Sequence, residues 1–367
     1  MADTYYVPRE TSACALGADR VSAALEQQLR GGETLVRNGS RGLLWLEPLL
    51  EVATDQGERI AFGAVTEDAV PGIVSALRGG EPEAHASYLG PTEDIPYLAG
   101  QQRLTFSRIG VGDPLCLDQY RALGGWRALE CALSLSGQQI IDQVRQSGLR
   151  GRGGAAFPAG IKWQTVLDAD GPQKYIVNNA DEGDSGSFAD RLLMECDPYQ
   201  VIESMIIAGF AVGADQGFIY LRSEYPLAHD ILQQAIDRAH QAGFLGDAVA
   251  GGERAFHLEL RLGAEAYICG EETSLLESLE GKRGMVRFKP PLPAIEGLFG
   301  RPTLVSNVLT LAAATTVLAE GADYYRDFGS GQSRGTLALQ LAGNIRRGGL
   351  VELAFGATLR DLLDRFG

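Results

Sequence analysis

The sequence has 367 residues, enough for two or three domains that each bury a core of their own. Hydrophobic residues make up 45% and charged residues 22%, as in ordinary globular proteins and unlike disordered chains. The formal net charge of −15 argues against nucleic acid as a partner, because phosphate backbones attract basic surfaces.

Residues 1–80 predict a small α/β unit. We expect strands at 4–7, 41–49 and 58–65 in this unit, and helices at 18–30 and 66–80. Two acids, Glu67 and Asp68, precede the apolar part of the second helix, and Gly79 and Gly80 end it. Residues 81–100 are polar and contain proline and glycine, which predicts a linker.

From residue 139 onward, helical and strand patterns alternate regularly. The expected elements are a helix over 139–148, a strand within 174–182, a helix over 198–213, a strand at 217–222, a helix over 225–243, a strand at 256–262 and a helix within 263–282. This β-α-β-α-β-α order predicts a parallel sheet covered on both faces, with ligands at the carboxyl ends of its strands.

The last part of the chain begins with a stiff extended connection at 289–293, "KPPLP". A helix is expected from Asn307 within 304–329, a strand within 335–345, and a strand followed by a helix over 349–367. This last unit ends on a helix without a closing strand.

Apolar runs and cysteines indicate the compartment. No apolar run reaches the ~18–20 residues that span a bilayer, and residues 1–20 lack the apolar core of a signal peptide. The cysteines are scattered without a CxxC motif, which argues against disulfides, a zinc site or a self-contained iron–sulfur cluster. We therefore expect a cytoplasmic protein with no metal site in this chain and no direct membrane insertion.

The stretch "GLRGRGGAAFPAG", 148–160, concentrates glycine next to positive charge. Gly151-x-Gly153-x-x-Ala156 resembles a dinucleotide fingerprint, but the residues before it predict a helix where that motif needs a strand. A plain turn is one interpretation. Bare backbone N–H groups, the two arginines of the stretch and nearby Lys162 favour a cradle for a phosphate or a flat ring.

Acidic residues follow two of the predicted strands. The stretch "NADEGDSGSFADR" holds four of them, Asp181, Glu182, Asp184 and Asp190. A solvated loop is the common explanation, and a calcium loop would need a different order of ligands. Placement at a strand end favours carboxylates that bind a polar ligand. Glu271 and Glu272 suit the first turn of a helix without any function, but they stand beside Tyr267 and Gly270 at a second strand end.

Four blocks of this sequence resemble, in order, the signature blocks of the NADH- and FMN-binding flavoproteins. The blocks are "SGLRGRGGAAFPAGIKW", "NNADEGDSGSFADR", "GAEAYICGEETSLLESLEGKRG" and "KPPLPAIEGLFGRPTLVSNV". The family includes the 51-kDa-type subunit of complex I, the diaphorase subunit of NAD-reducing hydrogenases and the flavin subunit of NAD-dependent formate dehydrogenases. The resemblance covers about residues 140–320 and implies a Rossmann-like, parallel-sheet FMN-binding domain.

The resemblance also implies the site residues. For FMN these are Gly151, Arg152, Gly153, Gly154, Lys162, Asn179, Asp181, Glu182, Tyr267, Gly270, Glu271, Glu272, Val305, Ser306 and Asn307. For NADH they are Phe157, Asp184, Glu272 and Lys289. No acid–base residue is required, because the flavin carries out the hydride transfer and Glu182 and Glu272 are expected to position the reactants.

Three departures from the family pattern stand out. Asp184 occupies a position where complex I members usually have glutamate, and Thr165 and Leu292 stand where aromatic residues can flank the adenine. The family's C-terminal domain with its [4Fe-4S] cluster motif lies outside residues 1–367. The cofactors expected in this chain are therefore FMN and NAD(H), with a [4Fe-4S] cluster only in the missing C-terminal region.

The N-terminal part resembles the thioredoxin-like [2Fe-2S] domain of the 24-kDa-type companion subunit. Pro8, Ala13, Pro48 and Val52 stand at its ligand positions, so no cluster can form. The predicted domains are 1–80, vestigial thioredoxin-like; 81–100, linker; 101–325, FMN- and NADH-binding; and 326–367, the start of a ubiquitin-like (SLBB, β-grasp) domain.

This domain order favours the flavoprotein (diaphorase) subunit of an NAD-dependent formate dehydrogenase. Such a subunit would work with a catalytic molybdenum or tungsten alpha subunit and a [2Fe-2S] thioredoxin-like gamma subunit, and would pass single electrons to iron–sulfur clusters. The alternatives are a diaphorase of an NAD-reducing hydrogenase, a complex I-type NADH dehydrogenase subunit, and a non-catalytic adaptor with a vestigial flavin site.

Overall fold

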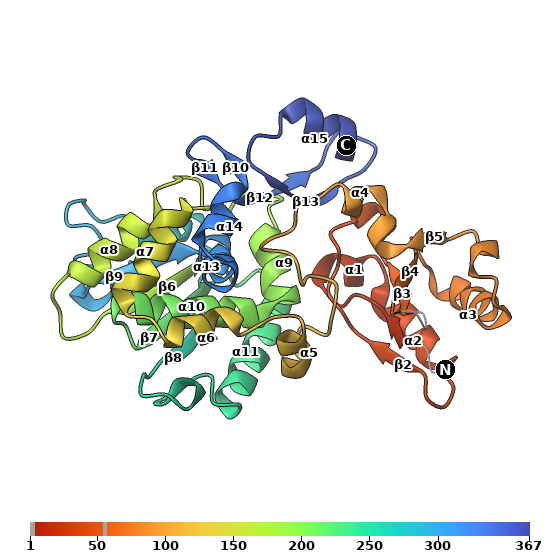
Figure 1. Ribbon diagram of the computed structural model, residues 1–367, viewed down its shortest axis with the longest axis horizontal. Coiled ribbons are helices and arrows are strands. Elements are labelled where there is room, and N and C mark those ends of the chain that lie inside the picture. The colour runs from red at the N-terminus through yellow and green to blue at the C-terminus, as the bar shows by residue number, and fades with distance from the viewer. Residues whose placement is uncertain (1–3, 54–56) are drawn as a thin grey trace. The chain divides into compact units, whose positions relative to one another are not determined.

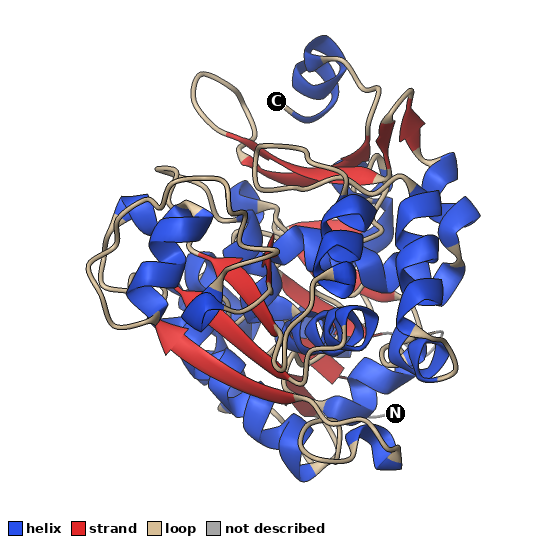
Figure 2. Cartoon of the chain, turned by 90° about the vertical axis from the view of Figure 1, so that its left-hand side faces the viewer, coloured by secondary structure: helices blue, strands red, loops and turns tan. Residues whose placement is uncertain are grey.

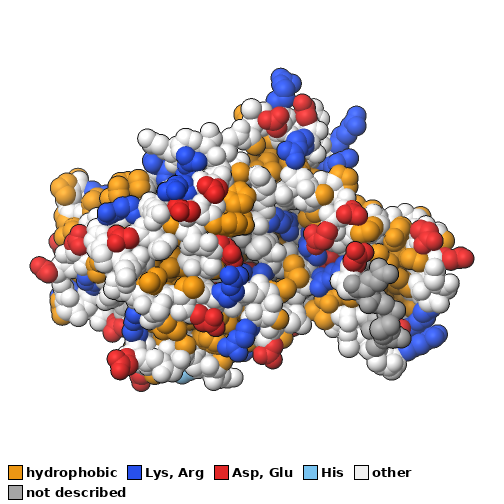
Figure 3. Space-filling model, in the orientation of Figure 1, with side chains coloured by type: hydrophobic (Ala, Val, Ile, Leu, Met, Phe, Trp, Pro, Cys, Tyr) orange, Lys and Arg blue, Asp and Glu red, His pale blue; other side chains and the backbone are white. Residues whose placement is uncertain are grey.

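The computed structural model describes residues 4–53 and 57–367, which form two units (Figure 1). The first unit contains the chain up to Cys116 together with 338–353 and 357–367. The second contains 117–337 and 354–356. Within the described residues, every helix is too short or too polar to cross a membrane. Acidic and basic side chains are interspersed on the face drawn in Figure 3.

The first unit is built on a mixed sheet with the strand order β2-β1-β3-β4-β5. The strands are β1 (Thr4–Tyr6), β2 (Thr34–Val36), β3 (Leu50–Ala53), β4 (Arg59–Phe62) and β5 (Tyr88–Pro91). Only the β1–β2 pair is parallel among these neighbours. Helices α1 (Thr11–Ala15), α2 (Ala18–Glu26) and α3 (Val70–Gly79) belong to the same unit. Their apolar side chains, such as Val21, Leu25 and Ile73, share a core with Tyr5 and Phe62 of the sheet.

Two predictions for this unit were wrong. The strand expected at 41–49 is a 3-10 turn, η1 (Leu44–Leu46), and the strand begins later, at Leu50. Pro48 interrupts the apolar run and has no N–H to give to a sheet ladder. The segment 81–100, expected to be a linker, contains β5, which pairs with β4, and the short helix α4 (Pro96–Ala99).

The C-terminal residues add a two-stranded sheet and a helix. Strands β12 (Thr336–Leu341) and β13 (Gly349–Ala354) pair with each other, and α15 (Leu359–Phe366) follows them. Leu341, Val351 and Phe366 share a buried cluster with Tyr97, whose ring meets that of Phe366 at 5.3 Å in an edge-on arrangement. Most of 326–367 thus packs within the first unit, although the sequence suggested a separate domain.

A buried carboxyl group in the first unit predicts a pH dependence of stability. Glu47 accepts hydrogen bonds from the Ser40 hydroxyl and the Leu49 N–H. Burial, and then the negative charge of Glu10, raise the pKa of Glu47 to about 8, although both hydrogen bonds oppose the shift. The folded state therefore holds a proton that the unfolded state releases, and the free energy of unfolding falls as pH rises from about 4.5 to about 8.

Glu47→Gln, which cannot ionise, is expected to remove much of this decline. Urea unfolding followed at about pH 5 and about pH 8 measures it in both proteins. The same loss of stability in the variant and the wild type would show that another group titrates.

The second unit is built on a parallel sheet with the strand order β8-β7-β6-β9. The strands are β6 (Tyr175–Ala180), β7 (Gln216–Leu221), β8 (His257–Leu262) and β9 (Thr303–Asn307). Helices lie against both faces, as Figure 2 shows. Leu275 and Leu276 of α12 (Glu272–Leu279) share a core with Val177 and Tyr220 on one face. This confirms the predicted parallel sheet.

The helices of this unit are α5 (Leu117–Ala122), α6 (Arg127–Leu133), α7 (Gly137–Ser147), α8 (Ala159–Asp168), α9 (Ala189–Cys196), α10 (Pro198–Val212), α11 (Pro226–Gln241), α13 (Val308–Glu320) and α14 (Ala322–Asp327). A small hairpin, β10 (Gly329–Ser330) and β11 (Ser333–Arg334), follows them. The predicted helix ends are confirmed at three places. Gly148 closes α7 with a φ of 71°, Pro198 is the first residue of α10, and Asn307 caps α13.

Strand β9 and helices α8 and α9 were missed. β9 pairs in parallel with β6, from Thr303 opposite Tyr175 to Asn307 opposite Asn179. Its short apolar run continues directly into the cap of α13, so no separate turn marks it in the sequence. This pairing brings Val305, Ser306 and Asn307 next to the end of β6.

Candidate functional site

A cavity of about 520 Å³ lies at the carboxyl ends of β6 and β9. The glycine loop, α8, the first turns of α12 and α13, and the segment 289–294 form its walls. It is lined by Gly151, Gly153, Ala155, Ala156, Phe157, Ala159, Lys162, Trp163, Thr165, Asn179, Gly270, Glu271, Glu272, Lys289, Leu292, Pro293, Ala294, Val305, Ser306, Asn307 and Thr310. Its size is within the usual range for a small-molecule site.

The glycine loop closes on itself and presents its backbone to the cavity. The Gly151 N–H donates to the Phe157 carbonyl at 2.8 Å, and the Ala159 N–H donates to the Leu149 carbonyl at 2.9 Å. Among the described residues, none accepts a hydrogen bond from the backbone N–H groups of residues 153–156. Successive free N–H groups of this kind form an anion-binding concavity.

Gly153 packs closely against Asn307, and both residues line the cavity. A Cβ at this position would lie 3.2 Å from the Asn307 Cβ, so even a methyl group would crowd the opposite wall. The loop therefore lets backbone, without side chains, line this part of the cavity.

Arg152 takes a different direction from the one the sequence suggested. Its guanidinium donates to the Tyr325 hydroxyl at 2.9 Å and to the Arg334 carbonyl at 2.7 Å, and lies 4.7 Å from the centre of the Phe355 ring. Its own N–H donates to the Thr310 hydroxyl at 2.8 Å. Arg152 thus anchors the glycine loop from behind, and its side chain does not line the cavity.

Two lysines and two glutamates form a continuous chain of ion pairs in the cavity. Lys162 Nζ lies 2.8 Å from Glu272 Oε2, and Lys289 Nζ bridges Glu272 Oε1 at 3.0 Å and Glu271 Oε1 at 2.9 Å. Half of the lysines in the sequence, two of four, meet here. Charges of opposite sign thus alternate along this wall of the cavity, and two lysine nitrogens lie there.

The pKa values of the two glutamates depend on burial and on the hydrogen bonds and positive charges that oppose its effect. Burial favours the neutral form of Glu271, but hydrogen bonds from Thr273, Lys289 and the Ser274 N–H outweigh it and lower the pKa to about 2. Burial of Glu272 is likewise outweighed, by Lys162 and Lys289, so its pKa is also lowered. Both carboxylates are therefore charged at neutral pH.

The acidic stretch after β6 is divided between structural and exposed positions. Glu182 accepts the N–H groups of Asp190 and Arg191, both at 3.1 Å, and so caps α9. Asp184 accepts the hydroxyl of Tyr267 at 3.1 Å, and the Tyr267 side chain is largely exposed. These residues lie beside the cavity without lining it.

Two further acids connect this stretch to the site. Asp190 is buried and accepts the Asn307 amide at 2.7 Å; burial and the charge of Glu182 raise its pKa despite that bond. Burial also raises the pKa of Asp181, to about 6, with Arg222 opposing and Glu224 adding to the shift. The acidic loop is thus tied to Asn307, which does line the cavity.

Most of the expected site residues meet in this cavity. Those that line it are Gly151, Gly153, Phe157, Lys162, Asn179, Gly270, Glu271, Glu272, Lys289, Val305, Ser306 and Asn307. Those that do not are Arg152, Gly154, Asp181, Glu182, Asp184 and Tyr267. Trp163 and Thr310 also line the cavity but were not predicted, since they follow Lys162 and the helix cap Asn307 without a motif of their own.

The residues present fit a flat ring with an anionic tail. Phe157, Val305 and the alanines of the glycine loop offer apolar surface, and the loop N–H groups together with Lys162 offer anion-binding donors. His, Cys, Asp and Glu side chains of residues 4–53 and 57–367 form no group of three that could hold a metal ion.

The comparisons with known proteins agree with this geometry. The family model of the Nuo51 FMN-binding domain matches residues 144–316. The chain is 45% identical over 267 residues to the NADP-reducing hydrogenase subunit HndC of Solidesulfovibrio fructosivorans, covering 73% of this chain and 54% of that subunit. It is 37% identical over 363 residues to the NAD-reducing hydrogenase HoxS subunit alpha of Cupriavidus necator, covering 96% of this chain and 59% of that subunit.

A solved structure shows the same similarity. A chain of an NAD+-reducing NiFe hydrogenase in the air-oxidised state matches with a TM-score of 0.62 and 26% identity, over 99% of this chain and 60% of that one. The present chain thus spans between 54% and 60% of the length of these relatives.

Proposed function

We propose that the chain is a flavoprotein of the complex I 51-kDa type, whose FMN-binding family model matches residues 144–316, and that it binds FMN and reacts with NAD(H). The observation that carries the proposal is the cavity itself. It joins bare glycine backbone, free N–H groups, apolar wall and two lysines at the carboxyl ends of parallel strands. That is where sheets of this class bind nucleotides.

The chain's own residues would bind, orient and shield the reactants. The free N–H groups of the glycine loop and Lys162 would hold an anionic group, and the apolar wall formed by Phe157 and Val305 would exclude water from a ring beside it. Lys289 would meet a second anionic group near Glu272. Bound FMN would supply hydride exchange with nicotinamide and single-electron transfer, which no side chain provides. Alignment in the cavity is therefore the protein's main contribution.

The parent complex that best suits this chain is an NAD-reducing hydrogenase, in which it would be the diaphorase subunit. The similarity to the HoxS alpha subunit extends over 96% of this chain and so includes the N-terminal unit. Formate dehydrogenase, which the domain order in the sequence favoured, is the second candidate, and a complex I-type enzyme is the third. In each case a [2Fe-2S] thioredoxin-like subunit is the expected neighbour.

The anaerobic visible spectrum of the purified full chain, with FMN added and then NADH, tests the proposal. We expect a bound flavin band that NADH bleaches, because the cavity would place both ligands together. A protein that stays colourless after incubation with FMN would overturn the proposal and support the non-catalytic adaptor.

The parent complex requires a separate assay. The native complex that contains this chain should reduce NAD+ with hydrogen if the hydrogenase assignment is right. Reduction with formate and not with hydrogen would restore the formate dehydrogenase assignment.

A further inference from the structure

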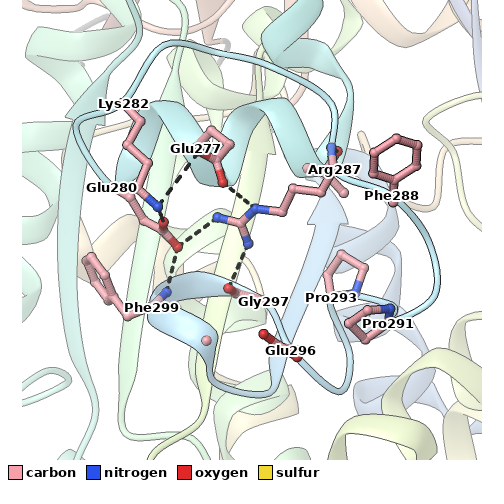
Figure 4. Close-up of a pocket in the computed structure, with 12 residues that line it drawn as sticks. Glu277, Glu280, Lys282, Arg287, Phe288, Pro291, Pro293, Glu296, Gly297 and Phe299 are labelled. Atoms are coloured by element: carbon pink, nitrogen blue, oxygen red, sulfur yellow. Dashed lines mark hydrogen bonds and ion pairs between the residues drawn. The ribbon is translucent and has the colours of Figure 1, made fainter.

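The segment 283–299 has almost no regular secondary structure, yet it forms part of the cofactor cavity. Lys289, Leu292, Pro293 and Ala294 line that cavity. The other side of the segment lines a second cavity of about 550 Å³, shown in Figure 4. Backbone hydrogen bonds fix the returning part of the segment, since the Thr303 N–H donates to the Pro293 carbonyl at 2.9 Å and the Gly297 N–H to the Arg301 carbonyl at 2.7 Å. Residues 283–291 make no such backbone–backbone bond in the described structure, so side chains must hold this part in place.

Arg287 holds the segment at three points. Its guanidinium lies 2.5 Å from Glu277 and 2.8 Å from Glu280, and donates to the Gly297 carbonyl at 2.9 Å, as Figure 4 shows. The two glutamates belong to the end of α12, and Gly297 belongs to the returning part of the segment. Glu280 also accepts the Phe299 N–H at 2.7 Å. One side chain thus ties the beginning and the end of the segment to α12.

These contacts continue to the lysine in the cofactor cavity. The Arg287 N–H donates to the Thr273 hydroxyl at 2.9 Å, and that hydroxyl donates to Glu271 at 2.5 Å. Glu271 in turn pairs with Lys289, which stands two residues after Arg287. Residues 287–289 are therefore attached to both ends of α12. Arg287 pairs with Glu277 and Glu280 at the C-terminal end of this helix, and Lys289 pairs with Glu271 at its N-terminal end.

We propose that Arg287 is a positioning residue that sets the affinity of this site for NAD(H) without touching the ligand. The inference rests on the proposed function. The Arg287 side chain is 24% exposed, and two carboxylates and a carbonyl accept its hydrogen bonds. Its role is therefore to place Lys289 and the 292–294 wall. Lysine cannot replace this planar fork with three matched contacts.

The test compares Arg287→Met and Arg287→Lys with Glu296→Gln in the full chain. Glu296 lines the same second cavity but has no ion pair with Arg287 in the described structure, so it serves as the matched control. With ferricyanide as acceptor, we expect Arg287→Met to raise KM for NADH on the order of tenfold while kcat and FMN content change little. Arg287→Lys should fall between the wild type and Arg287→Met, and Glu296→Gln should match the wild type.

Amide hydrogen exchange supplies a readout that does not depend on activity. Exchange within 288–297 should become faster in Arg287→Met and stay unchanged in Glu296→Gln. If exchange is unchanged in Arg287→Met, the inference is wrong, whether or not the wild type reacts with NADH. A wild type that does not react with NADH would by itself refute only the proposed function. Faster exchange with an unchanged KM in an active enzyme would also overturn the inference, as would loss of FMN together with kcat.

Discussion

Gly153→Trp is expected to weaken the affinity for FMN by roughly 100-fold or more. Gly153 lines the cavity, and its position leaves only 3.2 Å between an added Cβ and the Asn307 Cβ. An indole would therefore displace Asn307 or project into the cavity that both residues line, and either change would disturb the proposed FMN site. Flavin absorbance after dialysis against FMN measures the loss, and Gly153→Ala should show a smaller one because it adds a single methyl group.

Gly79→Trp provides the control. Gly79 is the last residue of α3, is exposed, and has nothing within 4 Å of an added Cβ. This variant should keep its flavin. A Gly153→Trp protein that is folded by circular dichroism and still yellow would exclude the cavity as the flavin site.

Glu203→Ala is expected to destabilise the second unit on the order of 3 kcal/mol. Glu203, on α10, is 2% exposed and accepts hydrogen bonds from the Tyr120 hydroxyl and from the N–H groups of Trp126 and Leu129, the latter two at 3.1 and 2.8 Å. Removal of this carboxylate takes away a buried acceptor from the Tyr120 hydroxyl and from the N–H groups of Trp126 and Leu129. Scanning calorimetry should show the transition of the second unit lowered by roughly 6–12 °C.

Glu130→Ala is the matched variant for this measurement. Glu130 lies on α6, close in sequence to Leu129, but its side chain is exposed. We expect its effect to stay within about 0.5 kcal/mol. Equal transition temperatures for the two variants would mean that Glu203 does not hold α6 against α10.

Local signals in the sequence were sufficient for much of the second unit. Apolar periodicity marked β6, β7 and β8 and helices α10, α11 and α12. Gly148, Pro198 and Asn307 marked helix ends, because caps act through residues within one turn. The glycine loop and the two glutamates at the start of α12 were likewise visible. Strand β9 was not, because its identity depends on pairing with β6, more than a hundred residues away in the chain.

The sequence by itself determined the alternation of β6, β7 and β8 with helices α10, α11 and α12, several helix ends and the residue types that the site contains. Only the tertiary structure decided which of these residues face the cavity. Lys162 and Glu272 meet across 110 residues, whereas Arg152, inside the glycine loop, turns away to Tyr325 and Arg334. The physical reason is that local conformation depends on near neighbours, whereas such contacts depend on sheet register and loop path, which the whole packed chain sets at once.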